Sequence, residues 1–121
     1  MRSKASYFEI PFKLPSLNDY IKACRTNAYA GAEMKKKIES DITPFLARLP
    51  VYYKPVYLTF NWIENTMKRD ADNIAFAKKF ILDALVKAGK LKDDSRRYVK
   101  GFRDVFYLSN ETKVLIQIME E

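Results

Sequence analysis

Two aspartates that stand two residues apart, Asp70 and Asp72, are the side chains of this sequence best suited to hold a metal ion. Residues i and i+2 of an extended segment point to the same side, so both carboxylates can converge on one spot. Two like charges that close repel each other unless a cation lies between them or one takes up a proton. Proteins usually hold Mg²⁺ with one or two carboxylates, together with water and substrate phosphate. We therefore expect a Mg²⁺ site here, with Mn²⁺ as an alternative ion.

Simpler structural roles compete for the same acidic residues. Asp72 is a good N-cap for the helix that its neighbours predict, and Asn73 is another. As a lone observation, the cap is favoured over the metal ligand. The Asp93-Asp94 pair is likewise typical of an ordinary solvated turn.

Asp94 joins the metal site only if it can reach Asp70. A straight helix over residues 73–88 would be about 24 Å long and would hold the two apart. Asp94 then arrives by a turn that folds back after Gly89, by a bent helix, or from a partner subunit. The spacing alone leaves these routes open.

The charge balance favours a polyanionic partner. Lysine and arginine number 22 against 15 aspartate and glutamate residues, which gives a net charge of +7 and a pI near 9.5. Nucleic acid is the partner this favours first, ahead of an acidic membrane surface. A basic protein can also simply be soluble, so charge alone does not decide the function.

The residue types that are missing exclude several kinds of chemistry. The chain has no histidine, and Cys24 is its only cysteine. This excludes histidine-dependent triads, histidine-ligated metals, internal disulfides and cysteine zinc sites, so an enzyme here must use carboxylates, lysines and tyrosines. No apolar run approaches the ~18 residues of a transmembrane helix, and no secretory signal is recognisable. We therefore expect a cytoplasmic protein with no membrane partner.

Hydrophobic periodicity predicts a single domain over residues 1–121, of α/β (α+β) class, with two main helices packed on a mixed sheet. The expected order is strand, helix, strand, helix, strand, strand, with an irregular connection over 14–29 after the first strand. The ranges are 7–13, 30–49, 54–65, 73–88, 97–108 and 112–119. We expect Pro44 to kink or restart the first helix and Pro50 to end it. The last two strands should form a hairpin around residues 109–111.

Four segments of the chain form a pattern that goes beyond composition. They are Pro15-Ser16-Leu17-Asn18-Asp19-Tyr20, Arg69-Asp70-Ala71-Asp72-Asn73, Leu82-Asp83-Ala84-Leu85-Val86-Lys87-Ala88-Gly89 and Asp93-Asp94. Together they resemble the RusA family of Holliday-junction resolvases, common in prophages, over about residues 8–118. The resemblance implies a RusA-like fold and a dimeric, Mg²⁺-dependent endonuclease. Such an enzyme resolves four-way DNA junctions by paired nicks in recombination and repair.

Carried over by position, the resemblance assigns Asp70, Asp72 and Asp94 as metal ligands and catalytic residues. The family's catalytic-site lysine lies four residues before the aspartate of the Leu-Asp-Ala-Leu run, which corresponds to Lys79. The interval from Asp72 to that aspartate is longer here than in the best-known member. Because extra residues rotate the face of a helix, Lys78 stays an alternative.

Basic side chains near these motifs are expected to bind the DNA backbone, and the resemblance gives Arg69 a phosphate contact. The expected set is Arg69, Lys68, Arg96, Arg97, Lys22 and Arg25. The lysine run 35–37 reads instead as a solvated helix face. Tyr20, Tyr29 and Phe102 are candidates to wedge against bases at the crossover, while most aromatic residues must belong to the core.

Three other functions stay open at this stage. The chain could be a nuclease of the same chemistry with a broader substrate range that includes forks and flaps. It could be a catalytically inactive protein that only binds junctions. It could also be a small structural protein in which the acidic motifs are a turn and a helix cap.

Overall fold

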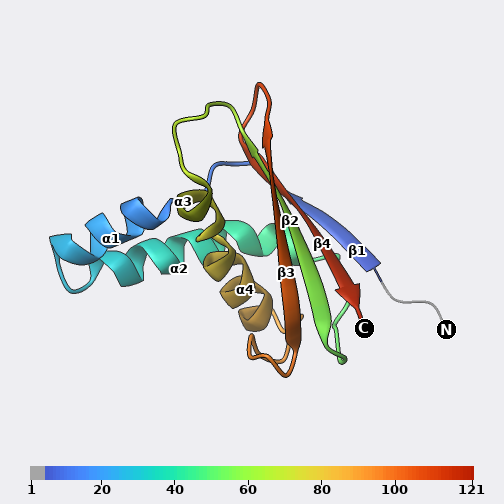
Figure 1. The fold of residues 1–121 in the computed structure, drawn as a ribbon. Coiled ribbons are helices and arrows are strands. Elements are labelled where there is room, and N and C mark those ends of the chain that lie inside the picture. The colour runs from blue at the N-terminus through green and yellow to red at the C-terminus, as the bar shows by residue number, and fades with distance from the viewer. Residues whose placement is uncertain (1–4) are drawn as a thin grey trace.

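The structure is a computed structural model that describes residues 5–121, and its strands form one mixed four-stranded sheet (Figure 1). The strands are β1 (Ala5–Ile10), β2 (Val56–Glu64), β3 (Val99–Leu108) and β4 (Lys113–Glu120). They lie in the order β1-β4-β2-β3, and only the β2–β3 pair is parallel. The helices are α1 (Leu17–Thr26), α2 (Ala30–Ile42), α3 (Ala71–Ala75) and α4 (Lys78–Lys87). The α+β class with a mixed sheet is confirmed.

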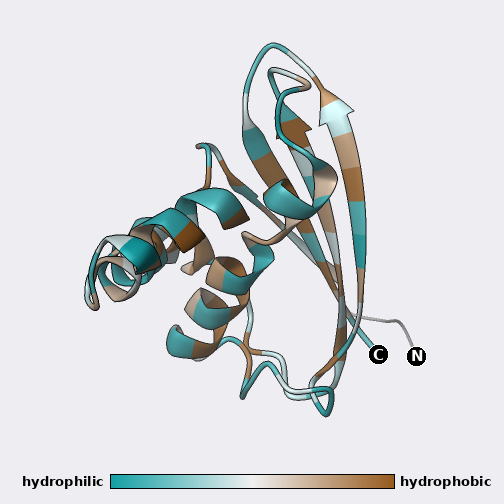
Figure 2. Cartoon of the chain, turned by 60° about the vertical axis from the view of Figure 1, so that its left-hand side comes forward, coloured by the Kyte–Doolittle hydropathy of each residue, from teal (hydrophilic) through white to brown (hydrophobic). Residues whose placement is uncertain are grey.

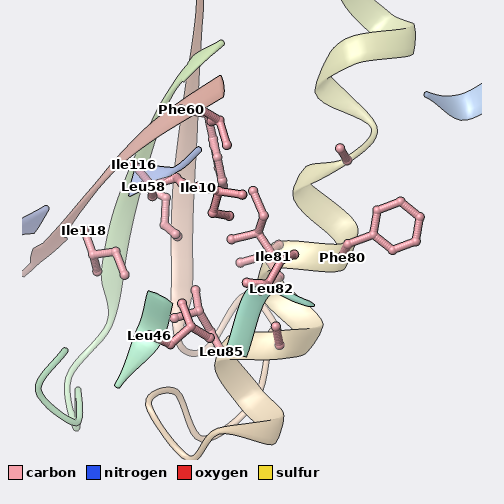
Figure 3. Packing of buried hydrophobic residues seen from close by; sticks show 14 of the residues in the cluster. Ile10, Leu46, Leu58, Phe60, Phe80, Ile81, Leu82, Leu85, Ile116 and Ile118 are labelled. Atoms are coloured by element: carbon pink, nitrogen blue, oxygen red, sulfur yellow. The ribbon is translucent and has the colours of Figure 1, made fainter. Parts of the chain in front are cut away.

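The core lies between one face of the sheet and the helices. Every second residue of β2 from Val56 to Glu64 is buried, as the period-2 geometry of a strand requires. Figure 2 shows hydrophobic and hydrophilic residues interchanging along the strands. Ile81 and Leu85 of α4 point toward this buried sheet face and are completely buried (Figure 3). The central strand and α4 are therefore the frame that positions the rest.

The predicted hairpin of the last two strands is wrong, although both strands exist. β3 and β4 do not pair with each other, because β2 lies between them and hydrogen-bonds to both. Two strand spacings are about 10 Å, a distance that the connection over residues 109–112 can span. The helices between β2 and β3 form the crossover that a parallel pair needs. Local alternation predicts strands well, but it does not say which strand lies next to which.

The predicted irregular connection over 14–29 is also wrong, because α1 occupies most of it. Ser16 caps this helix: its Oγ accepts a hydrogen bond from the Asp19 backbone N–H, 3.1 Å away. The Asp19 carboxylate in turn accepts one from the Ser16 N–H at 2.9 Å. This is a capping box with aspartate in the place of the usual glutamate. The Ser-x-x-Asp spacing was the sequence signal for a helix start.

We expect Ser16→Ala to lower the free energy of unfolding by about 1 kcal/mol, because the Asp19 N–H loses its acceptor. The Ser16 N–H holds the pKa of the Asp19 carboxyl below its usual value. The stabilising contribution of ionised Asp19 is therefore present above the unfolded pKa of about 3.9 and lost as the pH falls through the lowered one. The advantage of the wild type over Asp19→Asn should shrink accordingly in acid.

Urea unfolding at several pH values measures both effects. Ser40→Ala is the control, since Ser40 is exposed on α2 and should change stability little. Equal unfolding free energies for the wild type and Ser16→Ala would contradict the capping role.

The helices break at one predicted position and at one position that was not predicted. The helix expected over 30–49 restarts at Pro44, as predicted: α2 ends at Ile42 and a 3₁₀ turn, Thr43–Leu46, follows. The helix expected over 73–88 is not continuous, because residues 76 and 77 form a turn between α3 and α4. Lys79 and Phe80 there donate to carbonyls three residues back, the tighter 3₁₀ pattern. This turn changes the direction in which the lysines of α4 leave the helix.

Candidate active site

Asp70 and Asp72 both lie exposed at the start of α3. Asp70 has extended backbone and occupies the N-cap position, but its side chain makes no capping hydrogen bond. Asp72 is the second residue inside the helix, so it is not the N-cap. The pair also does not share an extended segment, which corrects the geometric reason for expecting the carboxylates to converge. The Asp72 Oδ1 accepts a hydrogen bond from the neighbouring Asn73 N–H at 3.0 Å, so this carboxylate has a local role at the helix start, whereas capping does not explain Asp70.

Lys79 lies in the first turn of α4 and contacts the loop that follows this helix. Its Nζ lies 3.2 Å from Oδ1 of Asp83 and 3.4 Å from Oδ2 of Asp94. The hydrogen bond from Lys79 to Asp83 is the main reason that the pKa of Lys79 is raised, and the charge of Asp94 adds to it. Lys79 is therefore cationic at neutral pH, with about half of its side chain exposed.

Asp94 contacts Lys79 of α4 within its own chain, so the loop after Gly89 folds back along this helix. α4 has 10 residues and is about 15 Å long, much shorter than the continuous helix expected. The left-handed φ of +76° at Gly89 lets the chain turn sharply after the helix. The Lys90 N–H then bonds the Leu85 carbonyl at 2.9 Å. The six residues from Gly89 to Asp94 can span the way back.

The alternative lysine, Lys78, lies on the sheet side of α4. It forms an ion pair with Asp104 of β3. Its Nζ also lies 4.8 Å from the centroid of the Phe102 ring. Of the two candidate lysines, Lys79 is thus the one that contacts Asp94.

Two residues of this cluster were missed by sequence reasoning. Asp83, whose side chain is 16% exposed, pairs with Lys79 and also with Lys35 of α2, whose Nζ lies 3.0 Å from Asp83 Oδ2. Asp83 Oδ2 makes no aligned hydrogen bond, so this contact is an ion pair only. Lys35 was interpreted as part of a solvated helix face. The alternating row Lys35–Asp83–Lys79–Asp94 joins α2, α4 and the loop after α4.

Asp93 has a local role. Hydrogen bonds from Ser95, including its backbone N–H at 2.8 Å, lower the pKa of the Asp93 carboxyl. This is the self-contained turn that Asx residues favour. The exposed Arg96 and Arg97 follow it directly and are therefore close in sequence to Asp94.

Arg69 holds the approach to the acidic pair in place. Its guanidinium donates to both oxygens of Glu64, at 2.9 and 3.0 Å, and to the carbonyl of Leu14 at 3.0 Å. Both side chains are largely buried, at 17% and 10% exposed. Arg69 thus ties the end of β2 to the segment before α1. This is a structural role, and its phosphate contact stays a prediction.

The other predicted DNA-binding residues lie on several exposed segments. Lys22 and Arg25 are on α1, and Lys68 is in the loop before α3. Lys22 also lines a hollow between α1 and α2.

The donor set suits Mg²⁺ in its chemistry, since carboxylate oxygens are the ligands that this ion prefers. Across residues 5–121, however, no three acidic, histidine or cysteine side chains lie close enough to hold a metal ion together. Asp70, Asp72 and Asp94 therefore do not form a three-carboxylate site in this conformation. One or two carboxylates with water and phosphate are a common alternative for Mg²⁺.

Comparison with known proteins does not indicate a function for this site. No family model matches the chain, and no curated protein matches it significantly. Among the described helices, none is long and apolar enough to span a bilayer.

Proposed function

We propose that this chain is a metal-dependent endonuclease that cuts branched DNA, with the Holliday junction as its main substrate. The observation that carries the proposal is the contact of Lys79 with Asp94, which places that carboxylate beside α4 in its own chain. Asp72 lines the same surface hollow as Lys79. The net charge of +7 suits a polyanionic substrate.

Each polar group of the cluster has a distinct role in this proposal. Asp70 and Asp72, with Asp94, would hold Mg²⁺, which supplies an activated water and polarises a phosphate oxygen. The hydrogen bond to Asp83 raises the pKa of Lys79, so this lysine stays cationic. Its positive charge would stabilise the negative charge that develops on a phosphate oxygen. Asp83 and Lys35 position Lys79 from the other side. The ion pairs hold Lys79 and Asp94 in place, whereas Asp70, Asp72 and Asp94 must come closer together than in this conformation before all three can hold one ion.

The proposal includes a homodimer, because a four-way junction has two-fold symmetry and two sites must cut symmetric strands. The sheet face away from the helices supports it. Tyr57 of β2 and Met119 of β4 are register partners on that face and are 46% and 39% exposed. A second copy covering this face would bury both side chains. A DNA substrate also favours a cytoplasmic location in a bacterial host.

A second candidate is a protein that binds junctions without cutting them. The separation of the acidic side chains favours it, since no three of them within residues 5–121 could share a metal.

Comparing nicking of a four-way junction, a fork, a flap and a linear duplex separates the candidates. We expect Mg²⁺-dependent nicks in the junction at symmetric positions and at least tenfold slower cutting of the linear duplex. Equal cutting of fork, flap and junction would favour the broader nuclease. Tight junction binding with no nicks in Mg²⁺ or Mn²⁺ would favour the binding protein and contradict the proposal.

A further inference from the structure

A hollow of about 650 Å³ opens beside the candidate active site, between α1, α2 and the α3–α4 turn. This volume is within the usual range for small-ligand pockets. Its apolar lining comes from Leu17, Tyr20, Ala75, Phe76 and Phe80, and its polar lining from Lys35, Asp72, Lys78 and Lys79. The hollow therefore joins an aromatic floor to the charged groups of the site.

Three rings form the floor. Tyr20 of α1 lies with its ring centroid 5.5 Å from that of Phe76, at a tilt of 33°. Phe80 meets both rings edge-on, at 6.0 and 5.6 Å. Figure 3 shows that Phe80 points away from the sheet, on the opposite side of α4 from the core residue Ile81. Phe80 is buried beneath the other two rings, while Tyr20 and Phe76 keep part of their surface open.

Two lysines, Lys35 and Lys79, line the hollow beside this floor, and we call them its rim. The side chains of Lys35 and Lys79 are 40% and 53% exposed. Both also belong to the row that leads to Asp94, so the rim is continuous with the acidic cluster. A ligand that fits has a flat apolar ring and a phosphate near it. A nucleotide has both.

Resting on the function proposed above, we propose that this hollow takes one unpaired nucleotide of the branched DNA. Its base stacks on Tyr20 and Phe76, and its phosphate contacts Lys35, which leaves Lys79 to the neighbouring phosphate that is cut. A base stacked in continuous duplex cannot enter, because it must first leave its pair and its neighbours. A base at a branch point costs less to extrude. The hollow thus recognises the branch itself, next to the phosphate that is cut.

A thermodynamic cycle tests the stacking. A fork with one unpaired thymidine at its branch is compared with the same fork carrying an abasic site there, which keeps the phosphate but lacks the base. Kd is measured by fluorescence anisotropy in EDTA, so that no cleavage interferes. The wild type should bind the abasic fork about tenfold more weakly, which corresponds to ~1.4 kcal/mol and lies within the range for base–aromatic stacking.

The variant Tyr20→Leu keeps apolar bulk but removes the ring. It should bind both forks with about the same Kd. Removing the base would then weaken binding only when the ring is present, which shows that the two are energetically coupled. Phe76→Leu is a second variant in case Tyr20→Leu does not fold. Tyr53→Leu is the matched control, because Tyr53 is 82% exposed outside the hollow and should keep the tenfold preference.

The outcomes separate this inference from the proposed function. Wild-type protein that nicks junctions but binds both forks equally would overturn the inference alone. A tenfold preference that survives in Tyr20→Leu and Phe76→Leu would also overturn it. Wild-type protein that neither binds nor nicks branched DNA would overturn both.

Discussion

Asp72→Asn should slow nicking of a four-way junction by at least about 100-fold while leaving junction affinity in EDTA within about twofold. Amide and carboxylate have nearly the same size, so the start of α3 keeps its packing. The amide is a far weaker metal ligand and carries no charge. The Asp72 Oδ1 accepts a hydrogen bond from the Asn73 N–H at 3.0 Å, and the side-chain oxygen of an asparagine can accept the same bond. Single-turnover nicking measured beside binding separates a loss of chemistry from a loss of affinity.

Two further variants make this result specific to the cluster. Lys79→Gln should also slow nicking, by roughly 100-fold, because it removes the cation beside Asp94. Asp41→Asn is the control: Asp41 lies on the exposed side of α2, where it pairs with Lys37 at 2.8 Å. It should nick as fast as the wild type. Undiminished nicking by Asp72→Asn would refute the metal-binding role of the pair.

Glu64→Ala should lower the free energy of unfolding by about 3 kcal/mol and the melting temperature by roughly 10 °C. Glu64 is 8% exposed and accepts two hydrogen bonds from Arg69. Removing it leaves a buried guanidinium that keeps only the Leu14 carbonyl as a partner. The loop that leads to Asp70 is also released, so nicking should fall with stability.

Calorimetry of Glu64→Ala and Asp41→Ala measures the difference between a buried and an exposed ion pair. The Lys37–Asp41 pair has side chains 75% and 43% exposed, so its loss should cost under about 0.5 kcal/mol. Similar melting temperatures for the two variants would contradict the stabilising role assigned to Arg69 and Glu64.

Much of the fold could be predicted from the sequence because its strands and its longer helices carry strong local periodicity. The predicted strand over 54–65 contains β2, and the restart at Pro44 follows from the chemistry of proline. The pairing of β2 between β3 and β4 could not be predicted, because it depends on contacts between distant segments. α1 could have been found, since Ser16 and Asp19 have the spacing of a capping box.

The candidate site divides in a similar way. Residue types and spacing indicated Asp70 and Asp72, and the family resemblance added Asp94, whereas the contact of Lys79 rather than Lys78 with Asp94 depends on the turn at residues 76–77. In that turn, backbone N–H groups donate to carbonyls three residues earlier, and the sequence has no proline or glycine there that would predict a break. The pairing of Asp83 with Lys35 joins elements that are 48 residues apart, and no local pattern contains it.

The central claim is that this chain cuts branched DNA with a metal ion, and the most direct measurement is a nicking time course on one four-way junction. The wild type is incubated with the end-labelled junction in Mg²⁺ and, in parallel, in EDTA. We predict paired nicks at symmetric positions in Mg²⁺ and an intact junction in EDTA. A junction that stays intact in Mg²⁺ and in Mn²⁺, at protein concentrations that bind it fully, would contradict the claim.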